Sequence, residues 1–165
     1  MTSWRAVLSF PRHVDERAAR LVATGVVALC AASLLTRSSW VLLVIAVGFA
    51  LRVASGPRFS PLARVAVMAA SRLGEPRLVP GAPKRFAQSV GLVVSGSAAV
   101  LGVAGFTRSA LALVALLLVF ASLEAFVGFC AGCFLFGRLV RAGVVGEQAC
   151  AACADLSVGA EPATS

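Results

Sequence analysis

The sequence predicts an all-α fold, an integral membrane four-helix bundle with one amphipathic helix on the cytoplasmic face. Two observations about composition and one about pattern lead to this prediction. Hydrophobic residues make up 59% of the 165-residue chain and charged residues 13%, against roughly 45–50% and 25% in soluble domains. The mean hydropathy is +0.94. Apolar runs of about 15 to 21 residues recur along the chain, near the length that a membrane-spanning helix needs.

A polar leader, residues 1–20, precedes the first apolar run. It contains Asp15 and Glu16, which are not typical of the short basic start of a signal peptide. We expect His13 and these two carboxylates to open the first helix, because a first turn favours negative charge. Glu16 is then placed to pair with Arg20 four residues later.

The first two apolar runs, residues 21–36 and 40–54, are short and are separated by a tight turn at Arg37. Both lie near the lower limit of about 17 residues for crossing a bilayer, so a shallow re-entrant hairpin is the alternative for this half. Arg52 lies inside the second run. Its charged end must therefore reach the interface or find a partner.

The central connection, residues 55–86, is predicted to lie on the cytoplasmic side and to carry the amphipathic helix. Ser60 followed by Pro61 is the pattern of an N-cap and a first helical residue. The apolar residues that follow share one face at helical spacing, as in helices that lie on a membrane surface. Three prolines are expected to keep the end of this connection extended: Pro76, Pro80 and Pro83.

The third and fourth runs cover residues 87–106 and 109–129, so that the transmembrane domain extends over residues 21–141. The third run is rich in small residues, which allow transmembrane helices to approach closely. These residues are Gly91, Ser95, Gly96, Ser97, Gly102 and Gly105. We expect the fourth helix to continue through Cys130 and Cys133.

The basic residues predict the orientation of the chain. Thirteen of the 15 Lys and Arg residues fall in the leader, in the stretch from Arg52 to Arg85, or after the fourth run. The excess of positive charge in cytoplasmic segments then places both termini in the cytoplasm. We predict a multi-pass protein of the cell inner (plasma) membrane. The net charge of +8 follows from this topology, and no nucleic-acid partner is expected, because no binding motif is present.

Four of the five cysteines form two matched pairs, Cys130 with Cys133, and Cys150 with Cys153 in the cytoplasmic tail at 142–165. Their spacing is that of an all-cysteine zinc site, tetrahedral and structural. The alternatives are dithiol–disulfide exchange or the carriage of persulfide sulfur. For exchange, a helix N-terminus lowers the pKa of the attacking thiol. Cys150 fits that position, whereas Cys130, expected late in the fourth helix, fits it poorly.

Glu124 is the one carboxylate inside an apolar run. An acidic residue there costs roughly 2.5–3.5 kcal/mol, which makes it a candidate functional residue. At 1.5 Å per residue, Glu124 lies about 22 Å into the fourth run and Arg52 about 18 Å into the second. We therefore predict an ion pair between them. The functional alternative is that Glu124 passes a proton to Cys130.

Four basic residues on the cytoplasmic side are candidates for binding an anion or a lipid: Arg52, Arg58, Lys84 and Arg85. The simpler interpretation is attraction to the headgroups of anionic membrane lipids. The more specific interpretation is a binding site for thiosulfate, sulfite or a phosphate group. No glycine pattern of a nucleotide-binding loop accompanies these residues.

Three motifs are specific in combination: Gly-Pro-Arg-Phe-Ser-Pro at 56–61, Pro-Gly-Ala-Pro-Lys-Arg-Phe-Ala-Gln at 80–88, and Leu-Glu-Ala at 123–125 with Cys-Ala-Gly-Cys at 130–133. With them, roughly residues 10–155 resemble a family of small bacterial integral membrane proteins catalogued as a domain of unknown function. Relatives are reported beside thioredoxin-like and sulfurtransferase-type proteins. The resemblance therefore implies thiol or sulfur chemistry and a partner of one of those kinds. It supplies no catalytic residue.

The predicted function is a component of membrane-associated thiol–disulfide or sulfur-transfer chemistry, oxidoreductase-like if it is an enzyme. Its candidate residues are the four paired cysteines and Glu124. The alternative is a non-enzymatic membrane scaffold, in which the same cysteines bind zinc and the tail docks a cytosolic partner. The third function is small-anion transport, which needs a homo-oligomer because four helices alone do not line a pathway.

Overall fold

The computed structural model describes residues 13–56 and 59–143, and most of them are helical. The all-α prediction is confirmed, with a short two-stranded ribbon that the sequence did not predict. The elements in chain order are β1 (His13–Asp15), α2 (Glu16–Thr36), α3 (Ser39–Ser55), α4 (Pro61–Ser71), β2 (Leu78–Pro80), α5 (Gly81–Val103), α6 (Thr107–Ser122), the π-helix η1 (Leu123–Val127) and α7 (Ala131–Arg141).

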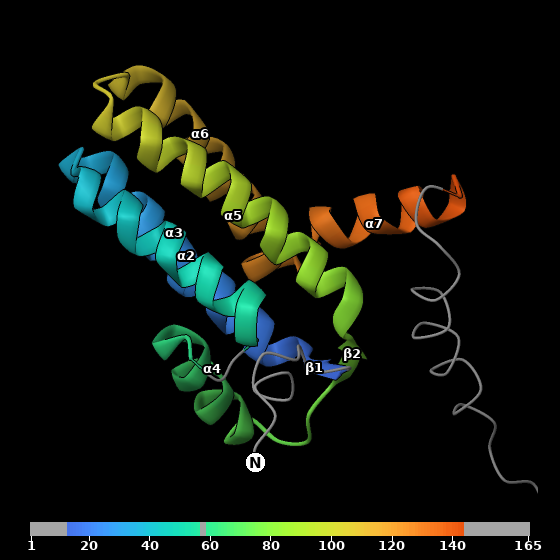
Figure 1. Ribbon diagram of the computed structural model, residues 1–165. Coiled ribbons are helices and arrows are strands. Elements are labelled where there is room, and N and C mark those ends of the chain that lie inside the picture. The colour runs from blue at the N-terminus through green and yellow to red at the C-terminus, as the bar shows by residue number, and fades with distance from the viewer. Residues whose placement is uncertain (1–12, 57–58, 144–165) are drawn as a thin grey trace, which may run out of the picture.

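Four long helices, α2, α3, α5 and α6, lie side by side and pack around one apolar core (Figure 1). Each of them contacts two of the others, in the cyclic order α2, α3, α5, α6. The core side chains are of modest size, which brings the helix axes close together. They are Val26, Cys30, Leu42, Ile45, Phe49, Ala98, Ala99, Ala110, Val114, Leu117 and Ala121.

Two glycines of α5 allow the closest helix contacts. A methyl group at Gly91 would lie 2.3 Å from the Phe49 ring of α3, and one at Gly102 would lie 2.8 Å from Leu42. Gly96, by contrast, has nothing within 4 Å of such a methyl. The predicted close approach of helices at small residues is therefore confirmed at Gly91 and Gly102, while Gly96 is not a packing position.

Three of the described helical segments are long and apolar enough to cross a membrane. They are α2, α5, and the continuous 21-residue segment Thr107–Val127, which consists of α6 and η1. They indicate a membrane protein. Helix α3 is also apolar but is shorter, with 17 residues. Large apolar side chains are exposed on the outer faces, for example Leu35 at 85% and Trp40 at 78%. Such faces suit contact with lipid better than contact with water.

The N-terminal part differs from the prediction at His13, whereas Glu16 lies in the first turn of the first helix, as predicted. His13 lies in strand β1, where it pairs with Pro80 of β2, and the first helix begins only at Glu16. Asp15 is the N-cap and accepts a hydrogen bond from the backbone N–H of Arg17 at 2.9 Å. This ribbon ties the start of α2 to the start of α5, a pairing of distant segments that no local pattern reveals.

The expected pair between Glu16 and Arg20 is absent among the described ion pairs. Glu16 lies 3.9 Å from Arg77 instead. Arg20 donates hydrogen bonds to the backbone carbonyls of Ala125 and Phe126 in η1. The local pairing was wrong because a partner distant in sequence satisfies each side chain.

Helix α4 begins as predicted, with Ser60 accepting a hydrogen bond from the backbone N–H of Ala63 and with proline at the first helical position. Its buried face consists of Ala63, Ala66 and Ala70, which pack toward α2. The larger apolar side chain of Val65 is 59% exposed and takes no part in this contact. Alanines form the contact because they let α4 approach α2 closely.

Helix α5 begins at Gly81, six residues before the predicted start at 87. The sequence led us to expect an extended segment here because of Pro83. In the first turn, however, a backbone N–H has no acceptor within the helix, so proline is tolerated there. The earlier start places Lys84 on a helix beside the core rather than in a loop.

The fourth helix does not continue through the cysteines, so that prediction was wrong. Helix α6 ends at Ser122, η1 follows, and Gly128 turns the chain with a left-handed φ of 78°. Helix α7 then begins at Ala131 and runs across the bundle direction (Figure 1). The apolar composition is unbroken across this turn, so only the glycine marked it in the sequence.

Candidate functional site

The site is centred on Cys130, which is the N-cap residue of α7. Its sulfur accepts a hydrogen bond from the backbone N–H of Cys133, with a donor–acceptor distance of 3.4 Å. Both thiols are free and partly buried. Our expectation that Cys130 is badly placed for a reactive thiol was wrong, because the break at Gly128 moves it from the end of one helix to the start of another.

The two thiols perturb each other. A hydrogen bond from the Cys133 thiol to the Cys130 sulfur lowers the pKa of Cys130 from 9.0 to about 7, and nearby Lys84 acts in the same direction. The same hydrogen bond, together with burial, raises the pKa of Cys133. Cys130 therefore ionises first. This difference is the one that an attacking and a resolving thiol require.

Lys84 of α5 and Glu124 of η1 form an ion pair beside the cysteines, with 2.5 Å between Nζ and Oε1. Their side chains are 11% and 17% exposed. The predicted Glu124–Arg52 ion pair was therefore wrong. Lys84 replaces Arg52 because α5 begins early enough to bring Lys84 to the level of η1.

Arg52 is 5% exposed and makes two neutral contacts. Its Nε donates a hydrogen bond of 2.8 Å to the side-chain oxygen of Gln88. Its guanidinium also lies over the Phe49 ring, 4.4 Å from the centroid. Among the described residues, no carboxylate lies within ion-pair distance of it. A buried cation without a carboxylate partner is unusual and is a candidate for binding an anion.

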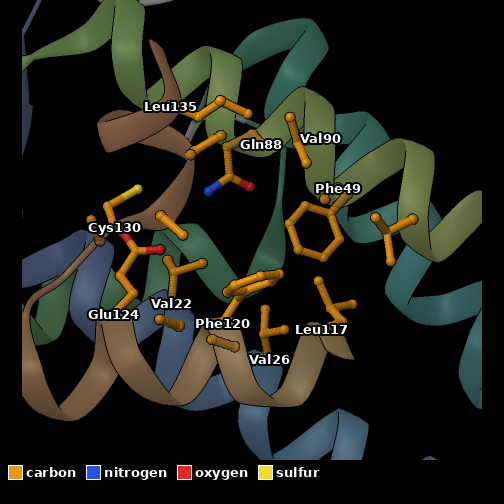
Figure 2. Close-up of a pocket in the computed structure, with 18 residues that line it drawn as sticks. Val22, Val26, Phe49, Gln88, Val90, Leu117, Phe120, Glu124, Cys130 and Leu135 are labelled. Atoms are coloured by element: carbon orange, nitrogen blue, oxygen red, sulfur yellow. The ribbon is translucent and has the colours of Figure 1, made fainter. Parts of the chain in front are cut away.

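A cavity of about 170 Å³ lies between α2, α5, α6 and α7 and reaches Cys130. Figure 2 shows Cys130, Glu124 and Gln88 gathered at one side of it, with Phe49 and Leu117 at the other. The remaining lining is mostly aliphatic. The cavity thus joins a polar end that carries a thiol to an apolar body.

A second cavity, of about 220 Å³, contains other predicted residues. It is lined by Arg52 and Lys84 together with His13, Asp15 and Gln88. The structure thus brings together two of the four basic candidates. Arg85 is exposed on α5 and does not line this cavity. Arg58 lies outside the described residues.

The second cysteine pair, Cys150 and Cys153, also lies outside the described residues, so the zinc site remains a prediction. Within 13–56 and 59–143, no three His, Cys, Asp or Glu side chains converge as metal ligands. Cys130 and Cys133 would supply only half of a four-cysteine set. Cys30, the remaining cysteine, is fully buried in the core.

Comparison of the sequence with known families gives one match. Residues 14–141 match the family model described as Domain of unknown function (DUF4395). The chain belongs to the DUF4395 family. No curated protein and no solved structure matches it. The DUF4395 match contains the ion pair of Lys84 with Glu124 and the pair of Cys130 with Cys133, and it ends before the second cysteine pair.

Arg20 is a member of the site that sequence reasoning missed. It donates hydrogen bonds to the carbonyls of Ala125, at 3.2 Å, and of Phe126, at 3.0 Å. These oxygens belong to the π-helical turn that precedes the cysteines, and such turns occur frequently at functional sites. The signal available in the sequence was a basic residue at the start of an apolar helix, where a negative charge is more favourable.

Proposed function

We propose that the protein performs dithiol–disulfide chemistry at a membrane surface, with Cys130 as the attacking thiol and Cys133 as the resolving thiol. The supporting observation is the position of Cys130 as N-cap of α7, with hydrogen bonds from the backbone N–H and thiol of Cys133. Donors at a helix N-terminus stabilise a thiolate. Lys84 adds a positive charge nearby.

The reaction is an exchange in two steps. The Cys130 thiolate attacks one sulfur of a substrate disulfide, which breaks that S–S bond and releases the other sulfur as a thiolate. Cys133 then loses its proton and attacks the Cys130 sulfur, which releases the second substrate sulfur. The substrate is reduced and the Cys130–Cys133 pair is oxidised. We assign Glu124 as the group that accepts the Cys133 proton, because it lines the same cavity as Cys130.

In the proposed topology, α2, α3, α5 and α6 all cross the inner (plasma) membrane, and both termini are cytoplasmic. The support is the distribution of charge between the two ends of the bundle. The turns α2–α3 and α5–α6 lie at the same end (Figure 1). One basic residue accompanies each of them: Arg37 in the first turn, and Arg108 at the start of α6. Helix α4 and the ribbon lie at the opposite end, where α4 would contact the lipid headgroups and α7 would meet a thioredoxin-like or sulfurtransferase partner.

A second candidate function is the binding of a small anion or a lipid phosphate at Arg52. It is favoured by the burial of this cation without a carboxylate partner, in a cavity that Lys84 also lines. The prediction is that Arg52→Gln abolishes binding of thiosulfate or phosphate to the purified protein. Transport of such an anion would in addition require a homo-oligomer.

The exchange reaction is tested by trapping its intermediate. The full chain, with Cys150 and Cys153 replaced by serine, is purified in detergent and treated with oxidised glutathione. Cys133→Ser should accumulate a mixed disulfide between glutathione and Cys130, because the resolving thiol is absent. The matched variant Cys130→Ser should accumulate much less. Equal labelling of the two variants, or none of either, would contradict the proposal, and mass spectrometry distinguishes these results.

A further inference from the structure

The cavity that Cys130 lines bears on which oxidant the Cys130–Cys133 pair uses. We infer that the cavity binds the ring of a membrane-soluble quinone, which accepts the electrons of the dithiol. This inference rests on the proposed function, because it needs Cys130 and Cys133 to form a reversible disulfide. It adds the chemical class of the second substrate.

The size and shape of the cavity suit one six-membered ring. Its volume is about 170 Å³, and an engineered cavity of about 150 Å³ in another protein holds benzene. The aromatic rings of Phe49 and Phe120 both face the space (Figure 2). Flat aromatic walls favour a flat ring over a water cluster or an ion, because ring pairs gain from stacked or edge-on contact.

The polar end is placed to donate to one of the ring oxygens. Gln88 lines the cavity, and its side-chain oxygen is occupied by the hydrogen bond from Arg52, so its N–H₂ group is left as the donor. A quinone oxygen accepts hydrogen bonds and donates none, so it matches this donor. Cys130 and Glu124 lie at the same end (Figure 2).

The cavity also reaches the outer surface of the helices. Three of its lining residues are substantially exposed: Val90 at 38%, Phe120 at 44% and Leu135 at 47%. They belong to α5, α6 and α7. All three are apolar, so an opening between them faces lipid more favourably than water. A ligand dissolved in the bilayer can therefore enter from the side, with its hydrocarbon tail left outside.

The reaction balances with the quinone as the sole oxidant. The Cys130 thiolate and the Cys133 thiol form an S–S bond as the S–H bond of Cys133 breaks, and two electrons pass to the quinone ring. One quinone oxygen takes the Cys133 proton by way of Glu124, which lines the cavity, and the other takes a proton from the solvent. The products are the disulfide and the hydroquinone.

The test uses ubiquinone-1, whose fully substituted ring does not add free thiols. The full chain with Cys150→Ser and Cys153→Ser is reduced in detergent, and hydroquinone formation is followed by absorbance together with loss of free thiols. We expect one hydroquinone per disulfide formed. Val90→Trp, at the exposed mouth of the cavity, should raise the quinone KM by about tenfold through steric exclusion. Val93→Trp on the same helix, 68% exposed and outside the cavity lining, should leave the KM unchanged.

Reaction with oxidised glutathione in water distinguishes failure of the quinone inference from failure of the proposed dithiol–disulfide exchange. If both tryptophan variants exchange normally with glutathione and only Val90→Trp is slow with quinone, the inference stands. If glutathione oxidises the pair but ubiquinone-1 does not, or if both variants respond alike to quinone, the inference is wrong and the proposed function survives. If neither oxidant forms the Cys130–Cys133 disulfide, the proposed function fails as well.

Discussion

At the residue scale, the environment of Cys130 makes its reactivity depend on pH near neutrality. Its pKa is lowered to about 7, so the thiolate forms as the pH rises through 7 and is lost below it. At pH 7 about half of Cys130 is then ionised, against about 1% for a thiol with a pKa of 9. We predict that alkylation of Cys130 by iodoacetamide reaches half its maximal rate near pH 7.

Replacement of Cys133 provides the control for this prediction. Cys133→Ala removes the thiol that donates to Cys130 and should move the midpoint of alkylation upward, toward 9. Cys133→Ser retains a donor and should move it less. Both variants keep the backbone N–H of the position. Mass spectrometry reports each cysteine separately, and a wild-type midpoint near 9 would show that the site does not activate Cys130.

The ion pair of Lys84 and Glu124 predicts strongly non-additive effects on stability. Removing one member of a buried pair leaves the other charge without a partner, which costs up to about 3–5 kcal/mol. We expect Glu124→Gln and Lys84→Met each to lower the free energy of unfolding in detergent, by less than this limit because the pair is partly exposed. The double variant Lys84→Met with Glu124→Leu should recover most of the loss. Additive losses would mean that the two residues act separately.

Most residues of the candidate site could be identified from the sequence, but their interaction partners could not. Glu124 was identifiable as a carboxylate in an apolar run, and Cys130 as half of a Cys-x-x-Cys motif. The similar depths of Glu124 and Arg52 in their apolar runs led us to predict Arg52 as the partner of Glu124. Lys84 was not considered because it was expected to lie in an extended loop. The choice between two cations at similar depth depends on where α5 begins and how it is rotated, which are tertiary properties.

At the element scale, the contact of α5 with α3 predicts opposite effects at two glycines of one helix. Gly91→Ala would bring a methyl group to 2.3 Å from Phe49, so the ring must shift. We expect it to lower the free energy of unfolding by about 1–3 kcal/mol. Gly96→Ala meets nothing within 4 Å and should raise it by about 0.5–1 kcal/mol through helix propensity. Thermal unfolding in detergent compares the two, and equal effects would contradict the packing described here.

The π-helix η1 depends on a side chain of another helix. Arg20 donates hydrogen bonds to a partly buried carbonyl, that of Ala125, and to an exposed one, that of Phe126. A buried carbonyl left without a partner costs about 1–3 kcal/mol, so the loss falls mainly on Ala125. We predict that Arg20→Met accelerates hydrogen exchange in the segment from Glu124 to Cys133. Arg17→Met, one turn earlier, removes a hydrogen bond to the carbonyl of Leu73 instead and should spare that segment. Equal protection in the two variants would exclude Arg20 as the support of η1.

Helix starts were predicted correctly where composition and local start signals agree. Element boundaries were predicted wrongly where a tertiary contact determines them. The start of α4 was correct because Ser60 and Pro61 act locally. The start of α5 was placed too late because proline suits both an extended segment and a first helical turn. The break before α7 was missed because apolar residues lie on both sides of Gly128. The ribbon was missed because each strand has three residues and pairs with a distant one.

At the scale of the whole molecule, the distribution of charge predicts which end of the bundle faces the cytoplasm. In a chain whose native cysteines are replaced by serine, we expect Ser38→Cys, between α2 and α3, to react with an impermeant maleimide added to intact cells. Glu75→Cys, between α4 and β2, should react only after the membrane is permeabilised. The reverse pattern would invert the topology. Labelling of neither site before permeabilisation would favour the re-entrant hairpin for α2 and α3.

The all-α class and the presence of long apolar helices followed from hydrophobicity, because the apolar runs and the turns between them are visible in the sequence. Hydrophobicity did not predict which helices contact one another or which cavities they enclose. The cavity beside Cys130 needs α7 to turn across the bundle, and this turn depends on Gly128 and on the hydrogen bonds from Arg20. Both features act together only in the folded chain.

The central claim is that Cys130 and Cys133 form a reversible redox pair in the folded chain. The most direct measurement is to equilibrate the full-length protein, purified anaerobically in detergent, with glutathione buffers of different ratio, and to map its disulfides by mass spectrometry. We predict one disulfide that joins Cys130 to Cys133, forms under oxidising buffers and is lost again under reducing ones. Absence of this disulfide at every ratio, with four thiols that react only after a chelator removes zinc, would contradict the account and favour the structural metal site.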